Sequence, residues 1–385
     1  MKRYRVGIIG FGFIGKVHYH GYLNLPLFYD PVPLDAAVTH VCTSRPETAE
    51  AAARLTGAEG VTDFRRITEN PAVDIVHICT PNSLHKDQLL SAIAHGKHIY
   101  CDKPLVSDMA EAEEIRSALN GYRGTGQMTL QNRFLPATIR ARQLVDEGFL
   151  GQVLEFRAAY LHAGSADPAA PMRWKLSAEY GGGVIADLCP HIFDLVHHLL
   201  GDFASLLALT HIAYPERPAK GDPARSVKVD AEDCVMLLAR MASGAPGAIE
   251  ATKIATGVED EPRLEIHGSR GALRFNGLNL NHLEAFDATA PDAPTGGRRG
   301  WTAIDTGQRY PRPASGFPGA KLSIGWLRGH MACLANFLGS VARGEPGDPG
   351  LDQGIYLQHL IDCARRSAAE GRWVDAARGD RSSRP

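Results

Sequence analysis

The sequence predicts an α/β protein with two domains: a doubly wound parallel sheet, then an α+β domain with a large, mostly antiparallel open sheet. Strand-like and helix-like segments alternate in the region before Gly124. After Gly124, β-rich runs separated by Gly and Pro turns replace that alternation. A chain of 385 residues is long enough for two cores. We place the domains at 1–125 and 126–385.

The elements of the first domain follow from runs of apolar residues. Unbroken apolar runs predict buried strands at 4–10, 36–42, 73–79 and 98–101. Helices are predicted from Gly15 onward and at 46–55, 84–95 and 107–119. The proline-rich segment Pro26–Pro33 predicts a loop that delays the second strand. Right-handed crossovers between such strands give a parallel, doubly wound sheet.

The second domain begins with a strand at 127–130 and a helix at 136–147. Further strands are predicted at 153–161, 205–213, 234–241, 247–254, 264–267 and 272–275. The Pro- and Gly-rich stretch 288–319 predicts an irregular loop. Amphipathic patterns predict helices at 324–341 and 351–369, and a frayed tail at 378–385.

The composition excludes several classes of partner. The formal net charge of −2 and the scattered Arg and Lys residues predict neither a nucleic-acid-binding nor a membrane-binding surface. No stretch is long and apolar enough to span a bilayer. The 7 cysteines form no Cys-x-x-Cys pair, which indicates reduced thiols and a cytoplasmic location. No metal-ligand cluster stands out.

The first motif that carries chemistry is Gly10-Phe-Gly-Phe-Ile-Gly15, between a predicted strand and a predicted helix. In this context Gly10 makes the turn, Gly12 lets the backbone approach a pyrophosphate, and Gly15 permits close packing of helix and strand. The N-terminus of the helix offers N–H groups and a positive dipole end to the phosphates. The alternative is a purely structural glycine turn.

The end of the second strand bears on the choice of cofactor. This strand is followed by Thr43, Ser44 and Arg45, with no carboxylate that would hold a ribose 2′-hydroxyl. Hydroxyls and a guanidinium suit a 2′-phosphate, so the turn favours NADP over NAD. The alternative is that Arg45 is a solvated loop residue.

Polar residues also follow the third and fourth strands, where parallel sheets bind ligands. Thr80, Pro81 and Asn82 follow one strand, and Asp102 and Lys103 follow the other. A lysine at such a place is usually a surface residue with a buried stem. Next to a nicotinamide, Lys103 would instead donate a hydrogen bond to a reacting oxygen.

The segment 181–194 contains three polar residues at helical spacing. Asp187, His191 and Asp194 fall at i, i+4 and i+7, so on one helix they share a face. A histidine flanked by carboxylates is suited to proton transfer. A polar stripe on a surface helix is the alternative. Pro190 lies either in a first helical turn or at a kink, which leaves the register open.

Taken together, these motifs resemble the Gfo/Idh/MocA family of NAD(P)-dependent oxidoreductases. The resemblance is carried by the glycine turn, the Thr80–Asn82 turn, the Asp102-Lys103-Pro104 step and the run from Gly181 to Asp194. It covers nearly the whole chain. The segments 26–33 and Ser165–Pro168 are similar to the levoglucosan dehydrogenase-like branch of that family.

The resemblance implies roles for single residues. Lys103, Asp187 and His191 match the family's catalytic residues. Asp102 stands where the family usually has a glutamate. The pair Trp174-Lys175 stands where the family has a Trp-Arg pair. The implied cofactor-binding set is Gly10, Phe11, Gly12, Phe13, Ile14, Gly15, Thr43, Ser44, Arg45, Thr80, Pro81, Asn82, His85, Asp102, Lys103, Asn132 and Trp174.

The implied activity is hydride transfer between a nicotinamide cofactor, NAD(P), and a hydroxyl-bearing carbon of a sugar, inositol or related polyol. Two alternatives stay open: a glycosidase that uses transient oxidation and elimination, and a sensor that binds dinucleotide without catalysis. The resemblance also implies a homo-oligomer, a dimer or tetramer formed through the C-terminal sheet. Glu250 and Lys253 lie on a predicted strand, from which they could reach the pocket. The alternative, which is usual for charges on a strand face, is that they are solvated.

Overall fold

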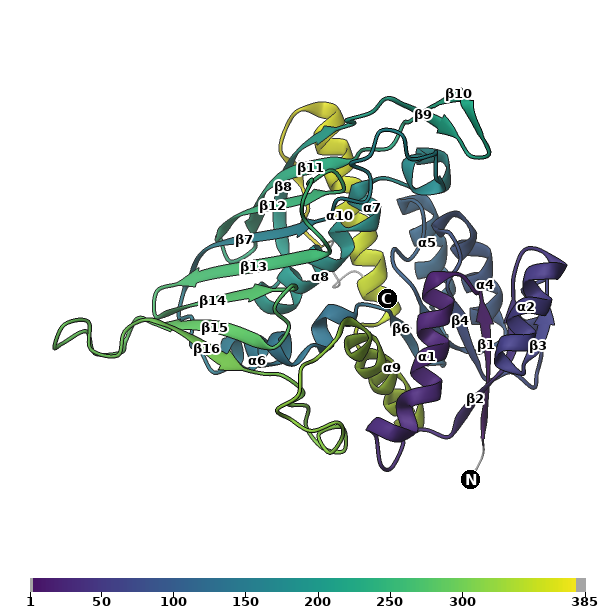
Figure 1. The fold of residues 1–385 in the computed structure, drawn as a ribbon, viewed down its shortest axis with the longest axis horizontal. Helices are drawn as coiled ribbons and strands as arrows, with labels where there is room; N and C mark the ends of the chain where they lie inside the picture. Colours follow the sequence, from purple (N-terminus) through teal and green to yellow (C-terminus); the bar gives the residue numbers. More distant parts are fainter. Residues whose placement is uncertain (1–2, 379–385) are drawn as a thin grey trace. The chain divides into compact units, whose positions relative to one another are not determined.

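The computed structural model describes residues 3–378 (Figure 1). These residues form two compact units, unit 1 (3–135 with 308–358) and unit 2 (136–307 with 359–378). Residues 379–385 of the predicted tail lie outside the described residues. In the part of the chain that is described, no helix is long and apolar enough to cross a membrane.

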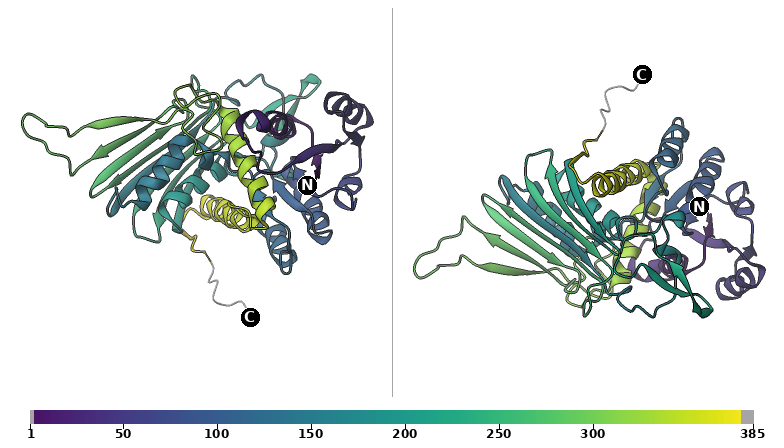
Figure 2. Two further views of the ribbon diagram at one scale, coloured as in Figure 1. Left: turned by 90° about the horizontal axis from the view of Figure 1, so that it is seen from below. Right: turned by 90° about the horizontal axis from the view of Figure 1, so that it is seen from above.

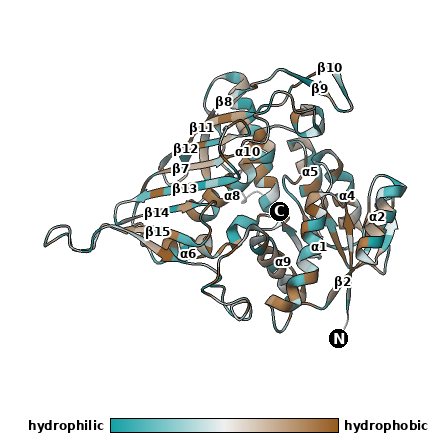
Figure 3. Ribbon diagram, viewed as in Figure 1, coloured by the Kyte–Doolittle hydropathy of each residue, from teal (hydrophilic) through white to brown (hydrophobic). Residues whose placement is uncertain are grey.

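Unit 1 is built on a six-stranded parallel sheet of order β3-β2-β1-β4-β5-β6. Its strands are β1 (Tyr4–Ile9), β2 (Ala36–Cys42), β3 (Glu59–Val61), β4 (Ile75–Ile78), β5 (His98–Cys101) and β6 (Gly126–Met128). After β3 the chain crosses to the other side of β1 and continues with β4. The strand order therefore reverses between β1 and β4, which is the topological switch point. The two central strands are the most hydrophobic part of this sheet (Figure 3), and Val6 to Ile9 of β1 and all of β4 are buried.

The helices of unit 1 have recognisable end signals. For example, α2 begins with Pro46 and ends at Gly57 in the left-handed conformation (φ 70°). The Asp108 side chain caps α5 by accepting a hydrogen bond from the N–H of Glu111. The helices are α1 (Phe13–Phe28), α2 (Pro46–Thr56), α3 (Arg65–Thr68), α4 (His85–Ala94), α5 (Met109–Ala118) and α9 (Trp326–Arg343), with 3-10 turns η1 (Asn82–Leu84) and η2 (Gln131–Phe134).

The proline-rich loop predicted at Pro26–Pro33 is wrong at its start, because α1 runs through Pro26 to Phe28. Pro26 lies in the last turn of the helix, where its missing N–H removes only one hydrogen bond. The N–H of Tyr29 then caps the helix by donating to the carbonyl of Leu25.

The segment 308–358 was predicted in the second domain, but its contacts place it in unit 1. The Gln127 amide donates to the carbonyl of Cys333 on α9 (3.0 Å) and accepts from Asn336 (3.0 Å). The N–H of Met128 donates to the carbonyl of Pro349. The edge strand β6 therefore ties this late segment to the parallel sheet. Helix α10 (Leu351–Glu370) contributes its first part to unit 1 and its second to unit 2.

Unit 2 contains a nine-stranded sheet of order β16-β15-β14-β13-β7-β12-β11-β8-β17. Only the β7–β12 pair is parallel, so the predicted mostly antiparallel open sheet is confirmed. Its strands are β7 (Val153–Leu161), β8 (Phe203–His211), β11 (Cys234–Met241), β12 (Pro246–Thr252), β13 (Glu261–Gly268), β14 (Gly271–Asn276), β15 (His282–Asp287), β16 (Trp301–Asp305) and β17 (Val374–Asp375).

The helices of unit 2 cover one face of this sheet (Figure 2). They are α6 (Pro136–Asp146), α7 (Val184–Asp187) and α8 (Cys189–Leu200), preceded by 3-10 turns η3 (Trp174–Leu176) and η4 (Ala178–Tyr180). A separate hairpin pairs β9 (Glu216–Ala219) with β10 (Asp222–Lys228). The sequence prediction missed this hairpin.

The loop predicted at 288–319 contains strand β16, so that prediction is wrong for Trp301–Asp305. Trp301 packs on Phe286 of β15 with ring centroids 5.7 Å apart. The Arg274 guanidinium stacks 3.9 Å from the Trp301 ring. These contacts to neighbouring strands hold the segment as an edge strand, although its proline-rich surroundings favour a loop.

Candidate functional site

The glycine turn of unit 1 has a shape that fits a dinucleotide. Gly10 has φ +88°, and a Cβ there would lie 2.5 Å from the carbonyl oxygen of Cys79. A Cβ on Gly15 would meet the carbonyl oxygen of Gly10. Both glycines are thus required by the fold itself.

Gly12 differs from its two partners, because a Cβ there would meet nothing within 4 Å. Gly12 precedes α1 and provides no side-chain cap, so the first N–H groups of the helix are left for another acceptor. An open approach to an uncapped helix N-terminus suits a pyrophosphate. The residues present therefore fit the predicted cofactor.

The remaining members of the turn divide by exposure. Phe11 packs against the core residues Val41 and Ala52 and lies 6.0 Å from the Tyr19 ring, so it contributes to packing. Phe13 is 72% exposed, and Ile14 is half-buried. Contact of these three side chains with the cofactor stays a prediction.

Two further turns lie at the carboxyl ends of β4 and β5, beside the switch point. Thr80 donates from Oγ1 to the Gln88 side chain at 2.9 Å, and Asn82 is buried at the start of η1. Asp102 accepts the N–H of Lys103 at 2.9 Å. The structure thus brings Thr80, Asn82, Asp102 and Lys103 to the edge of the sheet that carries the glycine turn.

His85 links the two turns. Its Nε2 lies 2.9 Å from the carbonyl oxygen of Thr80, and its Nδ1 lies 3.1 Å from that of Pro104 and 3.2 Å from that of Leu105. The ring is fully buried. His85 therefore holds the turns that follow β4 and β5 in register, and the predicted cofactor contact of its side chain stays untested.

The turn after β2 has the polar character that the sequence predicts. Thr43 Oγ1 lies 3.1 Å from the carbonyl oxygen of Arg45 and 2.7 Å from Thr48 Oγ1. Arg45 and Ser44 are exposed or nearly so. Among the described residues the Arg45 guanidinium makes no hydrogen bond or ion pair, so it is available to an anion or to solvent.

In unit 2, the predicted single helix over Asp187 and His191 is interrupted. Helix α7 ends at Asp187 and α8 begins at Cys189, with Leu188 between them. Pro190 lies in the first turn of α8, where its missing N–H costs nothing. The strict i, i+4 face is therefore wrong for Asp187 and His191, which lie on either side of a helix junction.

Asp187 lies between two lysines. Lys175 Nζ is 2.9 Å from Oδ1 and 3.0 Å from Oδ2, and Lys253 Nζ is 3.0 Å from Oδ2. The side chain of Lys175 is 47% exposed, whereas that of Lys253 is 7% exposed. The lysine that replaces the family's arginine after Trp174 thus pairs with the predicted catalytic aspartate.

His191 is buried in the first turn of α8, and Asp194 is buried one turn further on. The His191 ring lies 5.6 Å from the Tyr160 ring, which projects from β7. Burial raises the pKa of Tyr160 well above its ordinary value, and the neighbouring Asp260 and Asp187 carboxylates raise it further. Tyr160 is therefore a neutral hydroxyl beside His191.

Tyr160 was not predicted as a site residue. Of the two alternatives open for Lys253, solvation is wrong, because its side chain is 7% exposed. Alternation along β12 gives the available signal: Ile249 and Ala251 are buried, and Lys253 continues their side of the strand. A lysine at an inward position marks a buried charge that needs a partner.

Asn132 and Trp174 are the remaining predicted residues, and the Trp174 ring centroid lies 5.7 Å from Nζ of Lys175. Asn132 is buried in η2 of unit 1, and Trp174 is 38% exposed in η3 of unit 2. Their cofactor contacts stay predictions.

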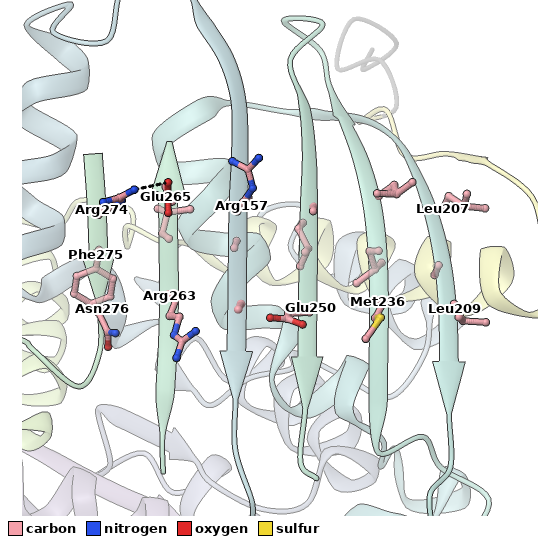
Figure 4. A pocket seen from close by; sticks show the side chains of 18 of the residues that line it. Arg157, Leu207, Leu209, Met236, Glu250, Arg263, Glu265, Arg274, Phe275 and Asn276 are labelled. Carbon is pink, nitrogen blue, oxygen red and sulfur yellow. Dashed lines mark hydrogen bonds and ion pairs between the residues drawn. The ribbon is translucent and has the colours of Figure 1, made fainter. Parts of the chain in front are cut away.

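A large concave surface lies on the open face of the nine-stranded sheet (Figure 4) and contains none of the predicted site residues. The chemistry is therefore assigned to the strand ends and not to that concavity.

A glycine turn that fits a pyrophosphate at a switch point, in a chain that also buries a histidine near a charged cluster, is typical of nicotinamide-dependent oxidoreductases. This chain is of that class. Comparison with known proteins gives the family. Residues 4–126 match the model of an oxidoreductase family with an NAD-binding Rossmann fold, and residues 138–274 match the GFO/IDH/MocA C-terminal domain. The chain belongs to the Gfo/Idh/MocA family of oxidoreductases.

Individual relatives extend over almost the whole chain. Levoglucosan dehydrogenase of Pseudarthrobacter phenanthrenivorans is 32% identical over 389 residues, covering 97% of this chain and 98% of the relative. Inositol 2-dehydrogenase of Rhizobium meliloti is 28% identical, covering 97% and 99%. A solved structure of levoglucosan dehydrogenase with NADH and levoglucosan has a TM-score of 0.92 at 32% identity, covering 98% and 100%. The predicted fold and family are confirmed, and the relatives that match along the chain are oxidoreductases named for levoglucosan and for inositol.

Proposed function

We propose that the chain catalyses reversible hydride transfer at a hydroxyl-bearing carbon of a sugar or polyol, with His191 as the proton carrier. His191 takes the hydroxyl proton during oxidation and returns it during reduction. Lys103 donates a hydrogen bond to the same oxygen, and Asp187 orients the substrate or the imidazole. The cofactor, when bound, accepts or supplies the hydride.

The observation that carries this proposal is the helix junction at Leu188. The junction places a charged carboxylate, Asp187, and a buried imidazole, His191, at adjoining helix ends. The two lysines form ion pairs with Asp187, and the neutral Tyr160 hydroxyl flanks the imidazole. A protein that only bound dinucleotide would have no use for this polar cluster, which argues against the sensor.

The cofactor would be held by unit 1, with its pyrophosphate at the Gly10–Gly15 turn. The Thr80–Asn82 and Asp102–Lys103 turns would hold the nicotinamide half, as the carboxyl ends of β4 and β5 require. Asn132 and Trp174 are assigned to the same cofactor through the family resemblance alone.

We propose levoglucosan and related pyranose sugars as the first substrates to test, because levoglucosan dehydrogenase matches the chain over almost its full length. The experiment follows reduced nicotinamide by absorbance with levoglucosan, glucose, xylose and myo-inositol, each with NAD and NADP. Net reduction of the cofactor with one of these sugars supports the proposal. Cleaved glycoside without net reduction would indicate the glycosidase, and binding without turnover would indicate the sensor.

We propose NADP as the preferred cofactor, because the β2 turn has no carboxylate and Arg45 is available to a phosphate. Arg45→Ala should weaken NADP binding by about 1–3 kcal/mol and leave NAD binding nearly unchanged. Titration of both cofactors against tryptophan fluorescence measures this. Tighter binding of NAD by the wild type would refute the preference.

We also propose that the open face of the nine-stranded sheet forms a homo-oligomer in the cytoplasm. Leu209, Met236 and Leu238 are 70%, 56% and 50% exposed there. Positively charged arginines and negatively charged glutamates flank these apolar residues (Figure 4). In a two-fold contact, arginines of one copy can therefore meet glutamates of the other. Sedimentation velocity should show a dimer or tetramer that Met236→Glu dissociates, and a monomeric wild type would refute the interface.

A further inference from the structure

Lys253 is a charged residue at a position where the neighbouring residues on the same side of the strand are apolar and buried. It directly follows β12, on the side of the strand where Ile249 and Ala251 are buried. Ala251 pairs with Tyr160 of the parallel neighbour β7. The lysine thus lies at the inner edge of the sheet, close to the strand position that carries Tyr160 beside His191.

The backbone of Lys253 is fixed from two sides. Its N–H donates to the carbonyl of Asp233 at 2.8 Å, and its carbonyl accepts from the N–H of Ser165 at 2.8 Å. Ser165 is held in turn by the fully buried Arg217, which donates to the Ser165 carbonyl at 2.6 Å. The side chain therefore starts from a rigid base, as a binding residue requires.

The ammonium of Lys253 is buried with unused donors. Its contact with Asp187 Oδ2, at 3.0 Å, is an ion pair whose geometry does not make a directed hydrogen bond. An ammonium carries three donors, and among the described residues Nζ has no hydrogen-bond acceptor. Burial of such a group is costly unless its donors are used. The missing acceptor is therefore an oxygen that the protein does not supply.

We propose that Lys253 is a substrate-binding residue that donates a hydrogen bond to a hydroxyl next to the one that is oxidised. The inference rests on the proposed function, since Asp187 and His191 define where the reacting hydroxyl lies. Lys253 touches Asp187, so its donors point to the neighbourhood of that hydroxyl. The substrate class is thereby narrowed to polyols with hydroxyls on adjacent carbons.

The experiment compares Lys253→Met with the wild type on levoglucosan, or whichever sugar of the panel is oxidised fastest, and on its monodeoxy derivatives. The wild type should lose about 10-fold or more in kcat/KM when the bound hydroxyl is absent. In Lys253→Met, the parent sugar should lose a similar factor, and the same deoxy sugar should lose less than about 3-fold. The discrimination between the two sugars should therefore collapse.

Lys175→Met is the matched control, since it removes the more exposed cation from the same carboxylate. It should retain the discrimination between parent and deoxy sugar. NADH binding and the urea midpoint verify that each variant is folded. If Lys253→Met does not fold, Lys253→Gln and Lys253→Arg are carried through the same comparison.

Equal losses for the parent and all deoxy sugars would overturn the inference and leave Lys253 as support for Asp187 alone. That result would leave the proposed function intact, because the wild type would still oxidise the parent sugar. A wild type that oxidises no sugar of the panel would overturn the proposed function, and this inference with it.

Discussion

Units 1 and 2 each bury a cluster of ionisable side chains, and the two clusters hold their charge differently. In unit 1, the Tyr22 hydroxyl lies 2.8 Å from His77 Nε2, and His77 Nδ1 lies 3.0 Å from His18 Nδ1. In unit 2, the Asp187 carboxylate lies between the ammonium groups of Lys175 and Lys253. The first cluster shares protons between neutral rings, and the second pairs full charges.

Burial explains the neutral state of the unit 1 cluster. It lowers the pKa of His18 from 6.5 to about 3, and burial together with His18 lowers the pKa of His77 well below its ordinary value. In unit 2, each lysine Nζ lies within 3.0 Å of an Asp187 carboxylate oxygen, so each charge has a partner of opposite sign. Burial thus favours neutral rings in the unit 1 cluster and an ion pair in the unit 2 cluster.

The largest expected effect separates a functional histidine from a structural one. His191→Asn should lower kcat by roughly 10²–10⁴ because the proton carrier is lost, while NADH binding stays close to wild type. Steady-state absorbance and cofactor fluorescence measure both quantities. His198→Asn, on the same helix, is the control and should retain kcat. A His191→Asn enzyme with full turnover would remove His191 from the mechanism.

Asp187→Asn should destabilise unit 2 by about 3–5 kcal/mol, because it leaves the buried Lys253 ammonium without its counter-charge. Hydrogen–deuterium exchange should show faster exchange in α7, α8 and β12, with unit 1 protected as before. The double variant Asp187→Asn/Lys253→Met should recover much of the loss. Equal destabilisation by the single and double variants would contradict the ion-pair account.

Acid should weaken unit 1 through its histidines. A lowered pKa in the folded state means that the unfolded chain binds more protons below pH 6.5, so stability is full above 6.5 and falls as the pH drops towards 3. His18 alone should remove about 2 kcal/mol by pH 5.

The test compares urea unfolding at pH 8 and pH 5, followed by exchange in unit 1. His330→Met removes another buried histidine with a lowered pKa and should reduce the acid loss. His95→Asn, at an exposed position, should leave the loss as it is in the wild type. A stability that stays constant between the two pH values would contradict the neutral cluster.

The smallest effect concerns the outer lysine of unit 2. Lys175→Met should change the free energy of unfolding by less than about 1 kcal/mol, because the Lys175 side chain is 47% exposed and solvent screens its pairing. Chemical denaturation with a tryptophan readout measures it. If Lys175→Met lowered the free energy of unfolding as much as Asp187→Asn does, the pairing of Lys175 with Asp187 would matter as much to stability as that of Lys253.

The sequence predicted the parts of the molecule that local patterns define. The strand at 36–42, the glycine turn and the place of Lys103 after a strand were predicted from runs and spacings. The single helix face for Asp187 and His191 was wrong, because the helix is interrupted at Leu188. The burial of Lys253 and the place of Tyr160 could not be read from the sequence, because they depend on which strands pair and which helices cover them. The β6–α9 contacts that place 308–358 in unit 1 join residues about 200 positions apart, which no local pattern reports.

Gly12 has a consequence for how this sequence can change over time. The fold forbids a side chain at Gly10 and Gly15, but nothing in the protein lies within 4 Å of a Cβ at Gly12. A Gly12→Ala chain should therefore fold normally and show its defect only when dinucleotide is offered. Selection on folding preserves two of the three glycines, and selection on nucleotide binding alone preserves the third. In descendants of this chain, a side chain at position 12 would therefore indicate that dinucleotide binding is no longer under selection.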